Sequence, residues 1–140
     1  RREVGGFARI TLIDKSPSRV EQIRRRIGPA RGRLEARTGD ALRLCEFLPS
    51  ESVTELTTDP PWGLFEPLPA PAEVFYPMML RQFDWVTKPG GMLTVLTADK
   101  DPYLRALTAH ASFALIERHD LLVNGKKAAI FLAQKSSPLP

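Results

Sequence analysis

Five consecutive residues, Asp59-Pro60-Pro61-Trp62-Gly63, combine groups that could hold a planar amine for chemistry. The two prolines fix φ at about −65° and carry no N–H, so the backbone forms a rigid turn that cannot continue a strand or open a helix interior. Such a turn can direct a side-chain oxygen of Asp59 and the carbonyl oxygen of Pro60 toward one spot, with the Trp62 ring beside it. Two acceptors and a flat ring suit a planar group that bears an NH2, such as a nucleobase.

The position of this turn in the chain favours a ligand site. Val53 to Thr58 is a short β-prone run that follows the turn residues Pro49 and Ser50, so the turn comes at the carboxyl end of a strand. In open α/β sheets, ligands bind at that edge. The alternative is a proline-rich loop around a buried Trp62, and the motif alone does not exclude it.

A first acidic residue follows an earlier predicted strand. The apolar run 7–13 ends at Asp14, after which Ser16 and Pro17 fit the N-cap and N1 positions of a helix. A carboxylate placed between a strand and a helix can accept both hydroxyls of a ribose. Asp14 taken alone could equally be an ordinary acidic residue at a helix entry.

A second acidic residue follows the next strand. Leu34 to Arg37 is predicted to be a short strand that leads into the turn Thr38-Gly39-Asp40-Ala41. Asp40 can cap the helix that follows and can also reach a ligand amine. Cys45, inside that short helix, is predicted to be a small core residue, because no basic activator lies near it in the sequence.

The remaining chain predicts further α/β elements. A loop stiffened by prolines, 64–72, follows the central turn, and Phe65 could add a second ring there. The next helix has one apolar face, made of Phe75, Met79, Phe83 and Val86. The residues Lys88-Pro89-Gly90-Gly91 are expected to end this helix and to begin a strand at 92–98 that is buried on both faces.

The carboxyl-terminal stretch predicts an antiparallel pair. The runs 114–123 and 128–133 are β-like and are joined by Asn124-Gly125, the strongest short signal for a hairpin. A dinucleotide-binding Rossmann domain would be expected to stay parallel at this end. The predicted fold is therefore an α/β sandwich around a mostly parallel sheet with an antiparallel carboxyl-terminal hairpin.

With its TDPPWG motif, its reversed last strand and this order of elements, the chain resembles the class I S-adenosylmethionine-dependent N-methyltransferases that carry an (Asp/Asn)-Pro-Pro-aromatic motif. Among these enzymes it most resembles the RNA guanosine-N2 methylases that are often fused to a THUMP domain. The resemblance covers nearly the whole chain after its start. It implies a Rossmann-like methyltransferase sandwich, the cofactor S-adenosylmethionine, no metal, and methyl transfer to an exocyclic amino nitrogen in RNA, with guanosine N2 of tRNA or rRNA as the target.

The resemblance also implies roles for particular residues. Asp59, Pro60, Pro61 and Trp62 would form the catalytic turn. Three residues would hold the base, and four others would join Asp59 in binding the cofactor. The substrate residues would be Trp62, Gly63 and Phe65, and the cofactor residues Asp14, Lys15, Asp40, Ala41 and Asp59.

Other functions remain compatible with the motif. DNA adenine-N6 and protein glutamine are amine acceptors that the same motif serves in related enzymes. A scaffold that keeps the fold without the cofactor, inside a larger RNA-binding assembly, is the alternative outside enzymes.

Composition places limits on the setting. The chain has 140 residues, of which 43% are hydrophobic and 26% charged, as in one globular domain. No apolar run approaches the roughly 20 residues that span a bilayer, no signal-peptide pattern opens the chain, and its single cysteine excludes an internal disulfide, so a cytoplasmic location without a membrane partner is expected.

Charge is uneven along the chain. Residues 1–48 contain 12 Lys/Arg against 6 Asp/Glu, a net +6, whereas the remainder contains 8 against 10, a net −2. A basic half suits a polyanion such as RNA, because attraction to phosphates is long-range. The equal alternative is a solvated face that includes Arg24, Arg25 and Arg26.

The family's glycine-rich first strand has no counterpart before Ile10, since Val4-Gly5-Gly6-Phe7 lies too near the start. Residues 1–140 are therefore expected to be a partial catalytic domain, inactive alone, with that strand and an RNA-binding domain upstream. Because the missing strand is central in the family's sheet, the strands that end at Asp14 and Thr58 are expected not to pair.

Overall fold

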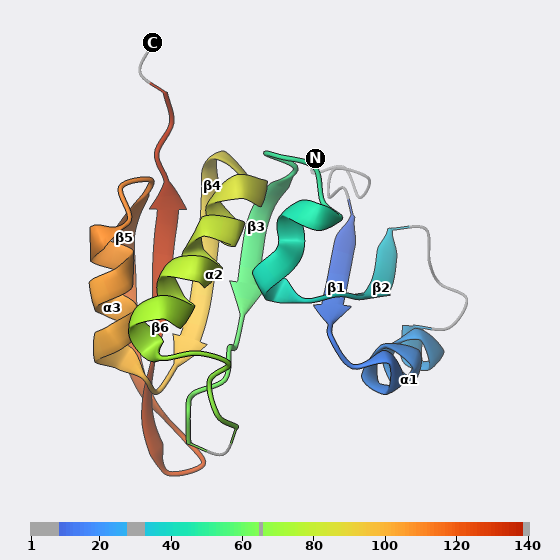
Figure 1. The fold of residues 1–140 in the computed structure, drawn as a ribbon, viewed down its shortest axis with the longest axis horizontal. Helices are drawn as coiled ribbons and strands as arrows, with labels where there is room; N and C mark the ends of the chain where they lie inside the picture. The colour runs from blue at the N-terminus through green and yellow to red at the C-terminus, as the bar shows by residue number, and fades with distance from the viewer. Residues whose placement is uncertain (1–8, 28–32, 65, 139–140) are drawn as a thin grey trace, which may run out of the picture. The chain divides into compact units, whose positions relative to one another are not determined.

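The computed structural model describes residues 9–27, 33–64 and 66–138. The chain divides into two compact units, Arg1–Leu44 and Cys45–Pro140, which are described separately. Figure 1 shows the elements of both units. Together they make an α/β protein with parallel and antiparallel strand pairs, as the sequence predicts.

The first unit is a strand–helix–strand motif. Strands β1 (Ile10–Asp14) and β2 (Leu34–Thr38) pair in parallel, with Asp14 opposite Thr38 at the end of the ladder. Helix α1 (Pro17–Ile27) begins where the sequence predicts, because the Ser16 hydroxyl accepts a hydrogen bond from the Arg19 N–H at 3.3 Å. Val20 is the fully buried residue of this helix. Phe7, at the start of the predicted first strand, lies outside the described residues.

The second unit contains a four-stranded mixed sheet in the order β3-β4-β6-β5. Strands β3 (Val53–Thr58) and β4 (Thr87–Thr97) are parallel, whereas β6 (Lys126–Lys135) is antiparallel to both β4 and β5 (Phe113–Val123). β1 and β3 thus belong to different sheets, and no ladder joins them among the described residues.

Helices α2 (Ala72–Val86) and α3 (Lys100–Ala109) lie together over one face of this sheet (Figure 1). The predicted apolar face of α2 is buried throughout. It packs with alternate side chains of β4 and β6, because alternate strand residues point to the same face. Fully buried residues of these elements include Met79, Phe83, Val86, Leu93, Val95, Phe131 and Ala133.

The start of β4 differs from the sequence expectation. The helix ends at Val86, and strand pairing begins at once with Thr87, which lies opposite Val53. Glu55 then lies opposite Met92, so the residues between Thr87 and Met92, which were expected to form a separate turn, are an irregular insertion within β4. Gly91 is required there, since an added Cβ would lie 2.6 Å from a methyl carbon of Thr87 and 3.0 Å from the Thr54 carbonyl oxygen.

The segment after β2 differs in part from the sequence predictions. The short helix after Asp40 is a 3-10 helix, Ala41–Glu46, which contains a kink at Arg43. Cys45 is exposed, so its prediction as a core residue is wrong. No described helix is both long enough and apolar enough to cross a membrane.

A charged cluster links the end of α2 to the segment between α3 and β5 and to the end of β6, at the amino edge of the parallel strands. Lys135 Nζ lies 2.9 Å from Asp84 Oδ1, while Ser112 Oγ donates to Asp84 Oδ2 at 2.9 Å and His110 Nε2 lies 3.1 Å from the same oxygen. Partial burial alone would raise the pKa of Asp84, but the hydrogen bonds from Lys135, His110 and Ser112 outweigh it and hold that pKa below its ordinary value.

Asp84→Asn is expected to lower the free energy of unfolding at pH 7 by about 1–3 kcal/mol, because hydrogen bonds to a charged group are lost. A carboxylate with a lowered pKa contributes its stability above its unfolded pKa of about 3.9 and loses it as the pH falls through the folded pKa. Denaturant titrations should therefore show the gap between the wild type and the variant closing in acid. Exposed Asp101→Asn is the control, and a gap that stays constant below pH 4 contradicts this account.

Candidate functional site

The Asp-Pro-Pro-Trp turn lies at the carboxyl end of β3, as predicted. β3 ends at Thr58, and residues 59–62 are neither helix nor strand. Asp59 is exposed, whereas Pro60 is buried, so the turn is anchored by a proline ring and presents its carboxylate outward. Gly63 follows with φ +81°, a left-handed conformation that favours glycine, and its N–H donates to the Glu66 carbonyl oxygen at 3.1 Å.

Within the turn, Asp59 and Trp62 are linked by a hydrogen bond. The indole Nε1–H of Trp62 donates a hydrogen bond to Asp59 Oδ1 at 2.8 Å. This bond orients the carboxylate and the ring relative to each other and leaves lone pairs on Oδ2 for a further donor. Sequence reasoning placed the two residues side by side but assigned the ring only a stacking role, because nothing in the spacing shows where the indole N–H points.

A second acidic residue lies at the same edge of this sheet, after β4. Asp99 follows Thr97, and its Oδ2 accepts a hydrogen bond from the Tyr76 hydroxyl at 2.9 Å. The Asp99 N–H in turn donates to Thr97 Oγ1 at 2.9 Å. Burial, and then the hydrogen bond to Asp99, raise the pKa of Tyr76, so its phenol stays neutral and remains a donor.

Neither Asp99 nor Tyr76 is among the residues predicted from the sequence. The signal for Asp99 was available, since an acidic residue directly follows the predicted strand 92–98. Tyr76 lies within α2, and no local pattern indicates that its hydroxyl reaches the end of a strand.

In the first unit, the two predicted cofactor acids lie at the ends of neighbouring parallel strands. Asp14 is the last residue of β1, and Asp40 comes two residues after β2. The Gly39 N–H donates to the Asp14 carbonyl oxygen at 3.0 Å and so ties the two turns together. Lys15 and Ala41, which were predicted beside them, are exposed.

Each of these acids also has a local bond. Asp14 Oδ1 accepts from the Ser16 N–H at 2.8 Å, and Asp40 Oδ1 accepts from the Leu42 N–H at 2.9 Å. The helix-entry role that was left open for Asp14 and the capping role of Asp40 are therefore real. Asp40 keeps its other oxygen for a further donor, whereas Asp14 Oδ2 lies 3.8 Å from Arg19 Nη1 in an ion pair that still leaves it a lone pair for a ligand hydroxyl.

The structure thus unites Asp59 with Trp62 in one unit, and Asp14 with Asp40 at one sheet edge of the other. Phe65, the predicted second ring, lies outside the described residues. Across the described ranges, no group of three or more His, Cys, Asp or Glu side chains forms a metal site.

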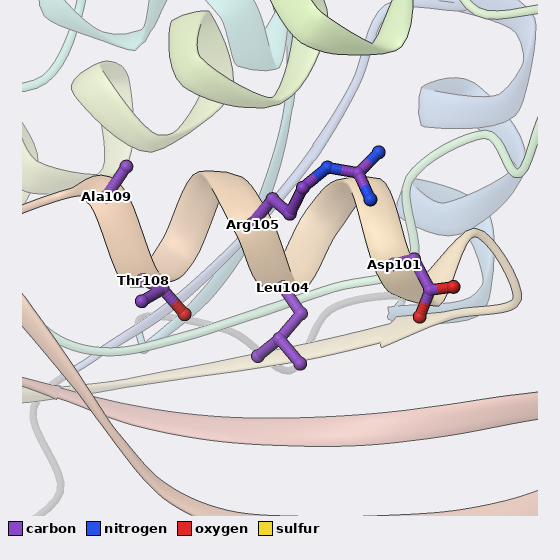
Figure 2. Close-up of a pocket in the computed structure, with 5 residues that line it drawn as sticks. All are labelled: Asp101, Leu104, Arg105, Thr108 and Ala109. Atoms are coloured by element: carbon purple, nitrogen blue, oxygen red, sulfur yellow. The ribbon is translucent and has the colours of Figure 1, made fainter.

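A shallow hollow is lined by residues of α3. Figure 2 shows that its lining comes from one helix, with side chains spaced three or four residues apart. None of the predicted site residues lines it. Its residues are Asp101, Leu104, Arg105, Thr108 and Ala109.

The basic helix of the first unit contains two different kinds of arginine. Arg24 Nε donates to the Ala36 carbonyl oxygen at 3.1 Å, so this side chain helps to pack α1 on β2. Arg25 is exposed and lies 3.9 Å from Glu21, an exposed pair that contributes little to stability. Arg26 is exposed as well. A test of RNA contact should therefore spare Arg24.

Arg25→Glu combined with Arg26→Glu is expected to flatten the salt dependence of RNA binding if these side chains contact phosphates. Each lost contact to single-stranded RNA should reduce the slope of log K against log salt by about 0.7. Fluorescence anisotropy over a series of salt concentrations measures this slope. Exposed Arg105→Glu on α3 serves as the control, and an unaltered slope in the double variant assigns Arg25 and Arg26 to the solvated face.

Several solved structures have a fold similar to that of this chain. TrmN from Thermus thermophilus matches with a TM-score of 0.77 at 24% identity, over 91% of this chain and 36% of TrmN. The N-methyltransferase NodS from Bradyrhizobium japonicum WM9 matches at 0.70 and 14%, over 92% of this chain and 74% of NodS. Geranyl diphosphate C-methyltransferase from Streptomyces coelicolor A3(2), in complex with Mg2+, geranyl diphosphate and S-adenosyl-L-homocysteine, matches at 0.68 and 13%, over 91% and 64%.

No protein-family model and no curated protein matches the sequence. This chain spans about a third of the length of TrmN. At these identities the likeness shows the architecture and not the reaction. The chain has the Rossmann-like α/β fold that methyltransferases share.

Proposed function

We propose that the protein transfers a methyl group from S-adenosylmethionine to an exocyclic amino nitrogen of a nucleobase in RNA, with guanosine N2 of tRNA or rRNA as the target. The observation that carries the proposal is the Asp59–Trp62 pair at the carboxyl end of β3. It sets an exposed carboxylate beside an aromatic ring at the sheet edge where α/β proteins bind ligands.

The acids of the first unit fit the cofactor by their chemistry. Asp14 and Asp40 are acceptors at adjacent strand ends, and the cofactor carries two ribose hydroxyls and an adenine amine as donors. When bound, S-adenosylmethionine supplies an electrophilic methyl group.

The turn would act on the substrate amine. An arylamine is a poor nucleophile, because its lone pair is delocalised into the ring. Hydrogen bonds from the amine to Asp59 Oδ2 and to the Pro60 carbonyl oxygen would favour a pyramidal nitrogen whose lone pair is available. Trp62 would stack on the base and, through its indole N–H, hold Asp59 in place. Positioning and hydrogen bonding then supply most of the catalysis.

Calorimetric titration of the intact protein with S-adenosylhomocysteine tests the cofactor half of this proposal. Saturable binding is expected, weakened by Asp14→Ala or Asp40→Ala and unaffected by Arg105→Ala. A titration without heat at several temperatures, together with no methyl transfer, favours the scaffold function instead.

The acceptor class rests on the motif resemblance and on the basic half of the chain. DNA adenine and protein glutamine present an NH2 group with similar chemistry. Methyl incorporation into RNA, DNA and protein, compared side by side, separates the three acceptors.

A further inference from the structure

The tip of the β5–β6 hairpin, defined as residues 122–127, projects from the sheet edge that carries the catalytic turn. Thr97, the last residue of β4, lies opposite Ala129 of β6, so the hairpin tip extends beyond the carboxyl end of β4. β3 is parallel to β4, and Thr58 lies opposite Val95. The hairpin tip and the turn that begins at Asp59 therefore leave the sheet at the same edge, as Figure 1 shows at its lower end.

The hairpin tip has a defined backbone. Asn124 and Gly125 have φ of 49° and 80°, the positive values that a two-residue type I′ turn requires at both positions. Pairing on each side of the turn is regular, with Val123 opposite Lys126 and Leu122 opposite Lys127. The backbone of the hairpin tip is therefore already ordered before any partner binds, so binding would cost little conformational entropy.

The side chains of the hairpin tip are basic and apolar. Residues directly opposite each other share a face and successive residues alternate, so Lys126 and Lys127 project to opposite faces of the hairpin. Leu122, on the face of Lys127, is 67% exposed. A lysine beside an exposed apolar side chain suits a chain that presents phosphates next to apolar ribose and base surfaces.

Asp120, two residues before the hairpin tip in the sequence, pairs with cations outside the tip. Asp120 Oδ1 lies 3.1 Å from Arg118 Nη2 and 3.8 Å from Lys100 Nζ. The hydrogen bond from Arg118 lowers the pKa of Asp120, which therefore stays ionised between two cations. Residues 118–127 contain three Lys/Arg against one Asp, a net +2, although residues 49–140 as a whole carry a net −2.

We propose that the hairpin tip binds the sugar–phosphate backbone of RNA next to the nucleotide held by the catalytic turn. Lys127 and Lys126 contact phosphates, and Leu122 packs against a ribose or base. The proposal rests on the proposed function, because it is the methylated nucleotide that brings the RNA to this edge. RNA contact is thereby assigned to the second unit as well, although the net negative charge of residues 49–140 would not predict RNA binding there.

The test compares two double variants of the intact protein. Lys126→Glu with Lys127→Glu changes the hairpin tip, and Arg81→Glu with Lys88→Glu makes the same charge change on exposed residues of α2 and at the opposite end of β4. RNA binding is measured by fluorescence anisotropy over a series of salt concentrations. The hairpin variant should lose about 10-fold or more in affinity at low salt and about 0.7–1.4 from its salt slope, whereas the matched control should keep the wild-type slope.

Further measurements separate the possible failures. Lys126→Gln with Lys127→Gln should show a smaller loss in the same direction, and thermal unfolding confirms that each variant is folded. In methyl-transfer assays the hairpin variant should raise KM for RNA with little change in kcat, and its affinity for S-adenosylhomocysteine should not change.

Equal slopes in the two double variants overturn the hairpin proposal, and the proposed function then stands if the wild type still methylates RNA. A hairpin effect on DNA binding but not on RNA binding also overturns it. If the wild type transfers no methyl group but its RNA binding depends on the hairpin lysines, the proposed function fails and the hairpin tip remains an RNA-binding surface.

Discussion

Asp59→Ala is expected to lower turnover by a factor of about 10² to 10³, with a smaller effect on the affinity for S-adenosylhomocysteine. The factor is that of removing one hydrogen bond made in the transition state, and it should appear in kcat as well as in kcat/KM. Single-turnover methyl transfer by the intact protein measures it. The carboxylate is exposed and is not part of the core, so stability should change by less than about 0.5 kcal/mol.

Two variants sharpen this result. Asp59→Asn keeps an acceptor oxygen that can still bond the Trp62 indole N–H, so it should retain more activity than Asp59→Ala. Exposed Asp101→Ala is the control for loss of a surface acid. Wild-type turnover in Asp59→Ala would end the assignment of Asp59 as the amine acceptor.

Trp62→Ala is expected to weaken both substrate binding and turnover, with a loss of about 1–3 kcal/mol in binding from base stacking alone. Trp62→Phe should be milder, because a phenyl ring still offers a π face. Both Trp62→Ala and Trp62→Phe also remove the hydrogen bond from the indole N–H to Asp59. Without the indole N–H, Asp59 loses the 2.8 Å hydrogen bond that orients it, so kcat should fall even where RNA affinity is kept.

The matched control is Trp85→Ala, since Trp85 is 49% exposed near the end of α2 and lies away from the turn. RNA affinity and kcat measured separately distinguish stacking from orientation of the acid. If Trp62→Phe is as damaging to RNA affinity as Trp62→Ala, the ring is a packing residue and the proline-rich-loop interpretation is correct.

Local patterns predicted much of the fold. The buried face of α2 follows from apolar residues three and four positions apart, and the hairpin follows from Asn124-Gly125, whose positive φ values a type I′ turn requires. The turn at Asp59 was placed at the end of β3 because prolines cannot continue a strand. In each case the information lies within a few residues.

What sequence reasoning missed depends on contacts between distant segments. The hydroxyl of Tyr76 reaches Asp99 across 23 residues, and the Thr87–Val53 pairing moves the start of β4 into a stretch that looks like a turn. Cys45 is exposed, and its backbone N–H donates to the Gln82 side chain of α2 at 2.9 Å, a contact across 37 residues. The Trp62–Asp59 bond is local, but side-chain direction is not encoded in spacing.

The most direct measurement of the central claim is the position of the transferred methyl group. The intact protein would be incubated with isotopically labelled S-adenosylmethionine and unmodified tRNA and rRNA, and the RNA digested to nucleosides for mass spectrometry. The account predicts the label on an exocyclic amino nitrogen, N2 of guanosine, and its loss in Asp59→Ala. Label on a ring carbon, a ring nitrogen or a ribose oxygen, or the same amount of label in Asp59→Ala as in the wild type, would contradict it.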